Sequence, residues 1–324
     1  MITTVLGDVW PETLGHCQIH EHVWVSETPA AQKYPQLRMD RPDESLAELI
    51  AYRRAGGHAL VDAQPVGAGR NVERLATFSK MSQVQIIAVT GFHRPMFYGE
   101  AHWIHQATVE QLTDLFSSEI ETGAFSDGDA EFPQVRTIHR AGLVKAALGP
   151  GEMDDWTLRL LKAAGMAAVK TGSALMMHTE AGQSAVEAIK LLADLGLPAQ
   201  RIIVCHVDRQ SENLAPHLNI AKTGAYLDYD TIGRFKYHSD ESEMTLIGHM
   251  ITAGHLDQLM LSLDTTAERF KSYGGPIGLD YLLKTFLPRL VRQGISMQVC
   301  TGMLRKNPAR VPPPNPNLNA TNHG

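Results

Sequence analysis

The chain has 324 residues, 44% of them hydrophobic, and a formal net charge of -6 at pH 7. This length and apolar content suit one large domain with a sizeable core, and the acidic balance argues against a general nucleic-acid binder. Only three cysteines occur, too scattered for a disulfide framework or a zinc finger, at Cys17, Cys205 and Cys300.

The first predicted element is a short buried strand over residues 15–25, which contains His20, Glu21 and His22. Strand side chains alternate between two faces, so the two imidazoles point the same way and Glu21 points away from them. Buried imidazoles need partners for their ring nitrogens, and a divalent metal ion supplies one. A pair of hydrogen-bonded core histidines is the alternative, so a metal site requires further ligands from the rest of the chain.

Alternating strand and helix patterns follow along the chain. Buried apolar runs predict strands at 58–64, 84–92, 140–147, 174–179, 201–207, 225–230 and 259–263. Amphipathic periodicity predicts helices at 46–55, 71–81, 108–122, 154–170, 184–195, 214–223, 241–253 and 278–293. Eight such units predict an α/β fold with parallel strands, a single (β/α)8 TIM barrel.

An open, doubly wound sheet is the alternative architecture, but no glycine-rich phosphate-binding motif follows the first strand. No interdomain linker interrupts the pattern, so residues 1–310 are expected to form one catalytic barrel. The remaining residues, 311–324, include Pro312, Pro313 and Pro314 and lack periodicity, which predicts a flexible tail.

Catalytic groups of such barrels gather at the C-terminal ends of the strands. Five of the predicted strands carry a group there that can bind a metal, namely His20 and His22, Lys145, His178, His206 and Asp264. Lys145 stands among apolar residues, where burial favours the neutral amine, and a neutral amine can react with carbon dioxide to form a carbamate that bridges two cations. Taken alone, each histidine could be a core residue and Lys145 a snorkelling strand-end lysine. Together, the six residues predict a dinuclear metal centre at this face.

These residues stand in five short motifs: Ile19-His20-Glu21-His22, Ala141-Gly142-Leu143-Val144-Lys145, His178-Thr179-Glu180-Ala181-Gly182, Val204-Cys205-His206-Val207-Asp208 and Leu261-Ser262-Leu263-Asp264. With residues 66–71 and 307–311, they resemble the signature of the phosphotriesterase family of the amidohydrolase superfamily. The resemblance implies a (β/α)8 barrel that holds two divalent metal ions, commonly zinc. His20, His22 and Asp264 would hold the more buried ion, His178 and His206 the more exposed one, and a carboxylated Lys145 would bridge them.

The ligand set also predicts the type of reaction. Two cations about 3.5–4 Å apart can share a hydroxide, which attacks a carbonyl carbon or a phosphorus centre. Asp264, in contact with both metal and nucleophile in this arrangement, is the predicted proton acceptor. Glu21 is expected to be a structural partner, and Cys205 is expected to point to the helix side of its strand and to have a packing role.

The loops after the third, seventh and eighth predicted barrel strands are expected to select the substrate. They carry seven candidate binding residues, namely His93, Tyr98, Arg234, Lys236, Arg269, Lys271 and Tyr273. The basic side chains could bind a phosphate or a carboxylate, although they could equally be ordinary solvated residues. The loops resemble those of the family branch that opens sugar lactones, phosphorylated ones included. We therefore predict a small anionic lactone held by Arg269, Lys271 and Lys236.

Three other functions remain open. A phosphotriesterase or aryl esterase would use the same metals on organophosphates or carboxylic esters, a mononuclear deaminase of the superfamily would do without the bridging lysine, and a non-catalytic binding protein would have lost ligands. A small-molecule partner is expected, and family resemblance favours a homodimer. The chain starts without a recognisable secretory signal and has no run approaching about 18 apolar residues, so a cytoplasmic location without membrane association is expected.

Overall fold

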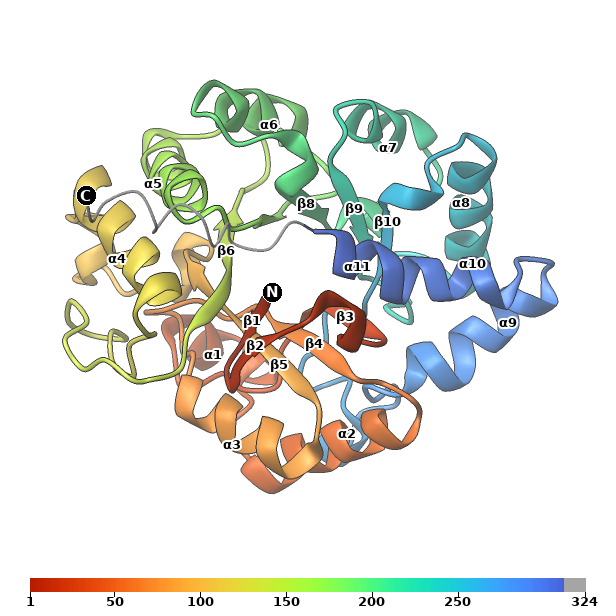
Figure 1. Ribbon diagram of the computed structural model, residues 1–324, viewed down its shortest axis with the longest axis horizontal. Helices are drawn as coiled ribbons and strands as arrows, with labels where there is room; N and C mark the ends of the chain where they lie inside the picture. The colour runs from red at the N-terminus through yellow and green to blue at the C-terminus, as the bar shows by residue number, and fades with distance from the viewer. Residues whose placement is uncertain (312–324) are drawn as a thin grey trace.

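Eight parallel strands form the sheet at the centre of the molecule, and helices surround it (Figure 1). The computed structural model describes residues 1–311, and the predicted tail beyond Val311 lies outside the described residues. The strands pair in chain order, which confirms the predicted (β/α)8 barrel; they are β3 (Cys17–Glu21), β4 (Ala59–Asp62), β5 (Gln85–Gly91), β6 (Ala141–Ala147), β7 (Leu175–His178), β8 (Ile202–Cys205), β9 (Tyr226–Tyr229) and β10 (Leu259–Leu261).

Helices cover the outside of the barrel. They are α1 (Pro29–Lys33), α2 (Pro42–Arg54), α3 (Val72–Ser82), α4 (Val109–Glu121), α5 (Asp155–Thr171), α6 (Ala185–Asp194), α7 (Leu214–Ala221), α8 (Asp240–Thr252), α9 (Leu287–Arg292), α10 (Met297–Thr301) and α11 (Asn307–Arg310). The seven helices predicted between residues 46 and 253 are confirmed to within a few residues at each end. Within residues 1–311, none of the helices combines the length and the apolar character needed to cross a membrane.

The last predicted helix, 278–293, is only partly correct. The chain forms a π-helical turn at Leu282–Phe286 before α9, and α10 and α11 follow where no helix was predicted. A second π-helical turn, Gly302–Lys306, precedes α11. Pro288 and Pro308 lack an amide hydrogen, so neither can complete the α-helical hydrogen-bond ladder of the turn before it.

A short hairpin, missed in the sequence, covers the N-terminal face of the barrel. Its strands β1 (Ile2–Thr4) and β2 (Gly7–Val9) pair antiparallel, and Figure 1 places them over the centre of the ring with α11 beside them. The amide of Val5 donates to the carbonyl of Ile86 in β5, over 2.9 Å. The hairpin approaches β6 so closely that a Cβ on Gly142 would lie 2.3 Å from the carbonyl oxygen of Thr3. This end of the barrel is therefore closed, which leaves the opposite end for chemistry.

The barrel closes between β10 and β3 through side chains rather than a continuous strand ladder. The hydroxyl of Ser262 accepts hydrogen bonds from the amides of Ile19 and His20, at 2.8 and 3.1 Å. Further along, the amide of Asp264 donates to the carbonyl of His20 over 3.0 Å. The seam thus holds His20 and Asp264 next to each other before any ligand binds.

Glu21 completes the seam, in agreement with its predicted structural role. Its carboxylate accepts the amide of Leu263 at 2.8 Å and both the amide and the hydroxyl of Thr265, at 3.1 and 2.6 Å. The side chain is fully buried, and this burial raises the pKa of Glu21 to about 8. The three hydrogen bonds that the carboxylate accepts oppose the rise. The residue between the two histidines therefore joins the first and last strands.

Glu21→Gln is expected to lower the free energy of unfolding of the metal-free protein by about 1–3 kcal/mol, because an amide nitrogen in place of one carboxylate oxygen cannot accept a backbone N–H. Urea denaturation measures the difference. Glu12→Gln, at an exposed position, is the control and should change stability by less than about 0.5 kcal/mol. Equal stabilities of the two variants would mean that the seam does not depend on the Glu21 carboxylate.

Candidate metal centre

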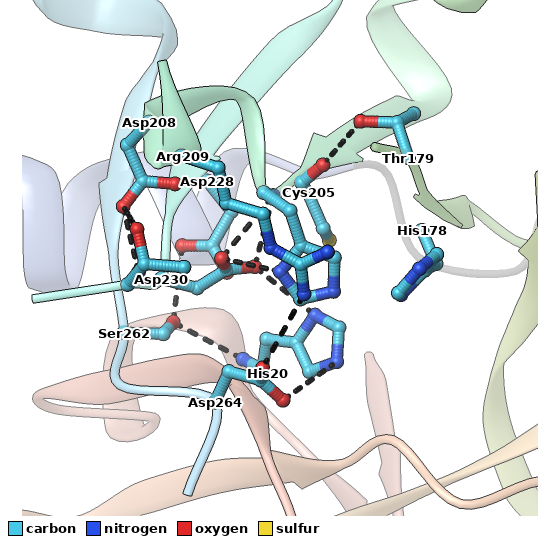
Figure 2. Close-up of polar contacts among 12 residues, drawn as sticks. His20, His178, Thr179, Cys205, Asp208, Arg209, Asp228, Asp230, Ser262 and Asp264 are labelled. Carbon is cyan, nitrogen blue, oxygen red and sulfur yellow. Dashed lines mark hydrogen bonds and ion pairs between the residues drawn. The ribbon is translucent and has the colours of Figure 1, made fainter. Parts of the chain in front are cut away.

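The predicted metal-binding side chains converge at the C-terminal face of the barrel. One pocket is lined by five of them, His20, His22, His178, His206 and Asp264, which come from β3, β7, β8 and β10 or the residues just after them. Figure 2 shows His20 beside Asp264, with His178 further across the site. The ring nitrogens Nε2 of His20 and His22 lie 3.7 and 3.5 Å from Oδ1 of Asp264.

The remaining histidines stand close by. The ring centroids of His178 and His206 are 4.3 Å apart, and those of His20 and His206 are 4.7 Å apart. One ligand atom each from His20, His206 and Asp264 lies within 4.8 Å of the other two. Burial lowers the pKa of His206 to about 3 and also lowers the pKa of His22, so these imidazoles are neutral at pH 7 and present lone pairs.

Lys145, the sixth predicted residue, lies in the wall of the barrel and is fully buried. Its Nζ donates to the carbonyl oxygen of Ala63 on the neighbouring β4–α3 connection, over 2.7 Å. Burial lowers the pKa of Lys145 to about 8. Its charge, added to the effect of burial, lowers the pKa of His93 in the pocket well below the usual value. The amine therefore sits among the histidines and loses its proton far more readily than an exposed lysine.

Two of the pocket residues adopt the left-handed backbone conformation. His206, directly after β8, has φ of 63°, and Asp264, a few residues beyond the end of β10, has φ of 48°. Residues other than glycine rarely occupy this region, and such conformations concentrate at functional sites. The amide of His206 donates to both carboxylate oxygens of Asp230, each at 3.2 Å, which holds the turn in place.

The turn at His206 explains why the predicted orientation of Cys205 is wrong. Strand alternation no longer applies across a left-handed residue, so Cys205 points into the barrel instead of toward the helices. Its side chain belongs to the hydrophobic cluster inside the barrel that also contains Ile19, Met176 and Ile203. The predicted packing role agrees with this position, since the thiol is fully buried.

Asp230, which follows β9, was missed in the sequence. Its Oδ1 lies 2.6 Å from Nδ1 of His206, and its Oδ2 lies 3.2 Å from Nδ1 of His20 (Figure 2). Burial opposes ionisation, but His206 and His20 together hold the pKa of Asp230 below its usual range. A carboxylate at Nδ1 selects the tautomer whose Nε2 lone pair points into the pocket. The alternation of aspartates at 228 and 230 at the end of a buried strand was the signal that could have identified it.

Three arginines line the same pocket, and two of them, Arg94 and Arg209, were not among the predicted residues. Glu180 bridges this pair, with Oε1 2.6 Å from Arg94 Nη1 and Oε2 2.7 Å from Arg209 Nη1. Although burial opposes it, the contacts with His178 and Arg209 lower the pKa of Glu180 to about 2. The third, Arg234, lies with Nη2 3.2 Å from Oδ2 of Asp264. Three cations facing two carboxylates leave the rim of the pocket positively charged.

Of the predicted substrate-binding residues, His93 and Arg234 line the pocket. The His93 ring stacks on Phe97, with centroids 3.8 Å apart. Tyr98 lies behind this pair, because its hydroxyl accepts the backbone amide of His93 at 2.8 Å and its side chain is buried. Tyr98 therefore positions the loop after β5 and is not itself part of the pocket lining.

The structure does not bring Arg269 and Lys271 to the pocket, which corrects the predicted anion site. The guanidinium of Arg269 is buried and donates to the backbone carbonyls of Leu263 and Ile232, the latter at 2.6 Å. Lys271 pairs with Asp280 over 2.9 Å, and its side chain is 54% exposed. Arg269 therefore satisfies backbone carbonyls in two turns. The composition of a loop does not distinguish this role from ligand binding.

Lys236 and Tyr273 also lie outside the pocket lining. Lys236 is exposed, with Nζ 5.0 Å from the ring centroid of Tyr237. The hydroxyl of Tyr273 donates to the carbonyl of Arg41 at 3.0 Å and lies 2.9 Å from Oγ of Ser45, which ties the loop after β10 to α2. The anion-binding role predicted for Lys236 and the substrate-binding role predicted for Tyr273 have no support in their positions.

Comparison with known proteins agrees with this geometry. The phosphotriesterase family model matches residues 1–311. A phospho-furanose lactonase from Mycoplasmopsis synoviae is 30% identical over 95% of this chain and 90% of its own length. The crystal structure of a lactonase from Listeria monocytogenes is 27% identical, with a TM-score of 0.87 over 96% of this chain and 98% of that one. The phosphotriesterase homology protein from Escherichia coli, solved with phosphate in its active site, is 27% identical, with a TM-score of 0.83 over 92% and 98% of the two chains. The chain belongs to the phosphotriesterase family.

Proposed function

We propose that the protein is a metal-dependent lactonase that opens a small sugar lactone carrying an anionic group such as phosphate. The observation that carries this proposal is a single pocket that combines the four candidate metal-binding histidines and Asp264 with three arginines at its rim. The names of the Mycoplasmopsis synoviae and Listeria monocytogenes relatives, phospho-furanose lactonase and lactonase, support the same substrate class.

The donor atoms of the pocket suit divalent cations. The Nε2 atoms of His22 and His20 face the Asp264 carboxylate at 3.5 and 3.7 Å, an arrangement of ligand atoms that a cation between them would stabilise. We assign His20, His22 and Asp264 to one ion and His178 and His206 to a second. Nitrogen and oxygen ligands of this kind suit Zn2+, which is the metal we propose.

Lys145 is proposed to bridge the two ions as a carbamate. The neutral amine nitrogen would attack the carbon of CO2, an N–C bond would form, and one proton would leave the nitrogen for solvent. The product is an anion with two oxygen ligands. The lowered pKa of Lys145, about 8 because of burial, supports this step by making the neutral amine accessible near pH 7.

When bound, two such cations supply an activated water and polarise an ester carbonyl. The residues of this chain orient the substrate and move the proton. Asp264 is charged, because Arg234 and His206 outweigh burial and hold the pKa of Asp264 well below its usual range. It is the carboxylate placed to accept the proton of the attacking water and to pass it to the leaving alkoxide. His93 and Phe97 form the apolar wall against which the sugar ring would lie.

Arg94 and Arg209 are proposed to bind the anionic group of the substrate. Arg94 contacts Glu180 through one nitrogen only, and its side chain is 31% exposed at the mouth of the pocket, so its other donors are available. Bidentate guanidinium contacts suit phosphate geometry. Arg94 and Arg209 would thus bind the anionic group in place of Arg269 and Lys271, for which the sequence predicted that role.

Turnover of matched lactones with and without a phosphate tests the proposal. Arg94→Met is expected to lower kcat/KM for the phosphorylated lactone by about 10- to 100-fold, the loss of one charge-assisted hydrogen bond, and to leave the unphosphorylated lactone unaffected. Lys236→Met, at the exposed lysine outside the pocket, is the control. An unchanged preference in Arg94→Met would reject the anion site, whereas no turnover of any lactone would reject the lactonase assignment.

A phosphotriesterase or aryl esterase is the second candidate, because the same donor set can act on a P–O or C–O ester and the Escherichia coli relative is named a phosphotriesterase homology protein. Relative rates on organophosphate triesters and on lactones separate the two. A charged rim disfavours neutral triesters. All six candidate metal-binding residues are present, the buried lysine among them, which favours both candidates over a binding protein or a mononuclear deaminase.

Two further proposals concern the setting of the enzyme. Cys17, Cys205 and Cys300 are free and buried in the structure, which supports a reducing, cytoplasmic compartment.

A homodimer is proposed from family resemblance, and gel filtration with light scattering tests it.

Asp230→Asn is expected to weaken metal binding by about 10- to 100-fold, because its carboxylate orients both His20 and His206. Titration of the metal-free protein with Zn2+ against a competing chelator measures the change. Asp257→Asn, a surface aspartate with its side chain 77% exposed, is the control. Identical affinities in the two variants would show that Asp230 does not orient the ligands.

A further inference from the structure

A second cluster of ligand-type side chains lies behind the pocket and takes no part in the proposed reaction. Asp208 lies in the 3-10 turn Val207–Arg209 after β8, His238 in the loop that leads to α8, and Glu243 in the first turn of that helix. One ligand atom from each lies within 4.8 Å of the other two. Figure 2 shows Asp208 on the side of the site away from His178.

The hydrogen bonds around His238 decide which of its atoms faces the cluster. Nδ1 lies 3.1 Å from the carbonyl oxygen of Ser239, which can only accept, so Nδ1 carries the hydrogen. Nε2 lies 3.0 Å from Oγ1 of Thr231. That hydroxyl already donates its hydrogen to Oδ2 of Asp208, at 2.7 Å. The Thr231 amide donates to the same oxygen, at 2.6 Å. A neutral His238 therefore presents the Nε2 lone pair to the cluster.

Three of the four carboxylate oxygens of the cluster lack donors. Asp208 and Glu243 are both fully buried, and no hydrogen bond reaches Oδ1 of Asp208 or either oxygen of Glu243. Glu243 Oε2 lies 3.2 Å from Nε2 of His238, whose side chain is 4% exposed. Burial lowers the pKa of His238, which favours the neutral ring over the charged one. Three carboxylate oxygens without donors and one imidazole lone pair therefore share a buried part of the protein, an arrangement that a bound cation would stabilise.

We propose that Asp208, His238 and Glu243 bind a third divalent cation, of the class that takes mixed imidazole and carboxylate ligands, such as Zn2+. The contact of Nδ1 with a backbone carbonyl is the usual support for a metal-ligating histidine. The three side chains are buried and none of them lines the histidine pocket, so the ion would have a structural role. It joins the turn that carries Arg209 to the connection between β9 and α8 that carries Arg234, and so holds two of the three pocket arginines in place.

Anomalous diffraction from crystals of the holoenzyme grown with Zn2+ tests the proposal directly. The expected result is a peak enclosed by Asp208, His238 and Glu243, in addition to the peaks at the histidine pocket. A filled histidine pocket with no peak at the second cluster would overturn the proposal and would assign a shared proton to this position. The two sites are separate in the map, so absence of ions from the histidine pocket would count against the proposed function only.

Metal analysis of purified variants provides the second measurement. Wild-type protein is expected to retain three zinc ions per chain and Glu243→Gln two, because an amide is a poor ligand for Zn2+. Glu241→Gln is the matched control on the same helix, since that side chain is 65% exposed and points to solvent, and it should retain three. Should Glu243→Gln fail to fold, the wild-type stoichiometry still decides, because two ions per chain would refute the third site.

Discussion

Asp264→Asn is expected to lower kcat for lactone hydrolysis by about 10²–10⁴-fold, the usual effect of removing a positioned proton acceptor. The carboxylate lies 3.7 Å from His20 Nε2 and 3.5 Å from His22 Nε2, and the Arg234 guanidinium keeps it ionised at 3.2 Å. Asparagine retains the shape and one oxygen ligand, so metal content should stay near that of the wild type while the proton has no acceptor. Steady-state kinetics and metal analysis of the same preparation measure both quantities.

A matched control for this variant is Asp114→Asn, at an aspartate whose side chain is 75% exposed and pairs with Lys170 on the surface. That change should leave kcat within about two-fold, since isolated surface pairs contribute little. If Asp264→Asn also retained wild-type kcat with full metal content, the proton would have to leave by another group, and the proposed role of Asp264 would be wrong.

Lys145→Met is expected to act on metal retention instead of proton transfer. Methionine fills nearly the same volume without a nitrogen that could form a carbamate, so both ions lose their shared ligand. We expect metal affinity to fall by more than about 100-fold, beyond the range seen when only a supporting residue is removed, and activity to fall with it. The metal-free variant should be at least as stable as metal-free wild type, because the buried amine makes only one hydrogen bond, to Ala63.

Metal content after dialysis and urea denaturation of the metal-free protein measure these effects. Lys170→Met, at a lysine whose side chain is 51% exposed, is the control and should leave metal affinity unchanged. Reconstitution of the wild type with Zn2+ in buffer freed of carbon dioxide should be slow and should accelerate when bicarbonate is added. Full and rapid reconstitution without carbon dioxide would contradict the carbamate.

The two expected results separate two proposed functions. Lys145, in the wall of the barrel, is proposed to hold the ions, whereas Asp264 is proposed to accept the proton of the attacking water. For the arginines at the pocket rim we propose a third function, substrate selection. The Arg94 side chain contacts Glu180, whose carboxylate in turn lies 3.3 Å from Nε2 of His178.

The order of strands and helices could be predicted because each barrel strand is an apolar run between turn residues, and this local pattern is enough to indicate burial on both faces. The candidate ligands could be found for the same reason. His20, Lys145 and His178 are polar interruptions within or at the end of such runs, where a side chain has no ready partner except another strand end or an ion. Local sequence patterns therefore predicted the fold, the face of the barrel that carries the site and the candidate metal-binding residues.

The pocket rim could not be predicted in this way. Arg94 and Arg209 follow different strands, β5 and β8, and the side-by-side pairing of the strands brings both to Glu180, which follows β7. Arg269 and Lys236 looked equally suitable in the sequence, yet one is buried against backbone carbonyls and the other is exposed beyond the pocket. A long flexible side chain can reach several partners, and composition does not say which one it takes.

The amino-acid sequence by itself determined the alternation of buried strands and helices and the residues that end those strands, because burial and side-chain periodicity are local properties. Tertiary structure decided which of those ends share a pocket, how Asp230 and the left-handed turn at His206 aim the imidazoles, and which arginines surround them. These outcomes depend on distances between segments far apart in the chain, which are set only when β10 meets β3 and the barrel closes.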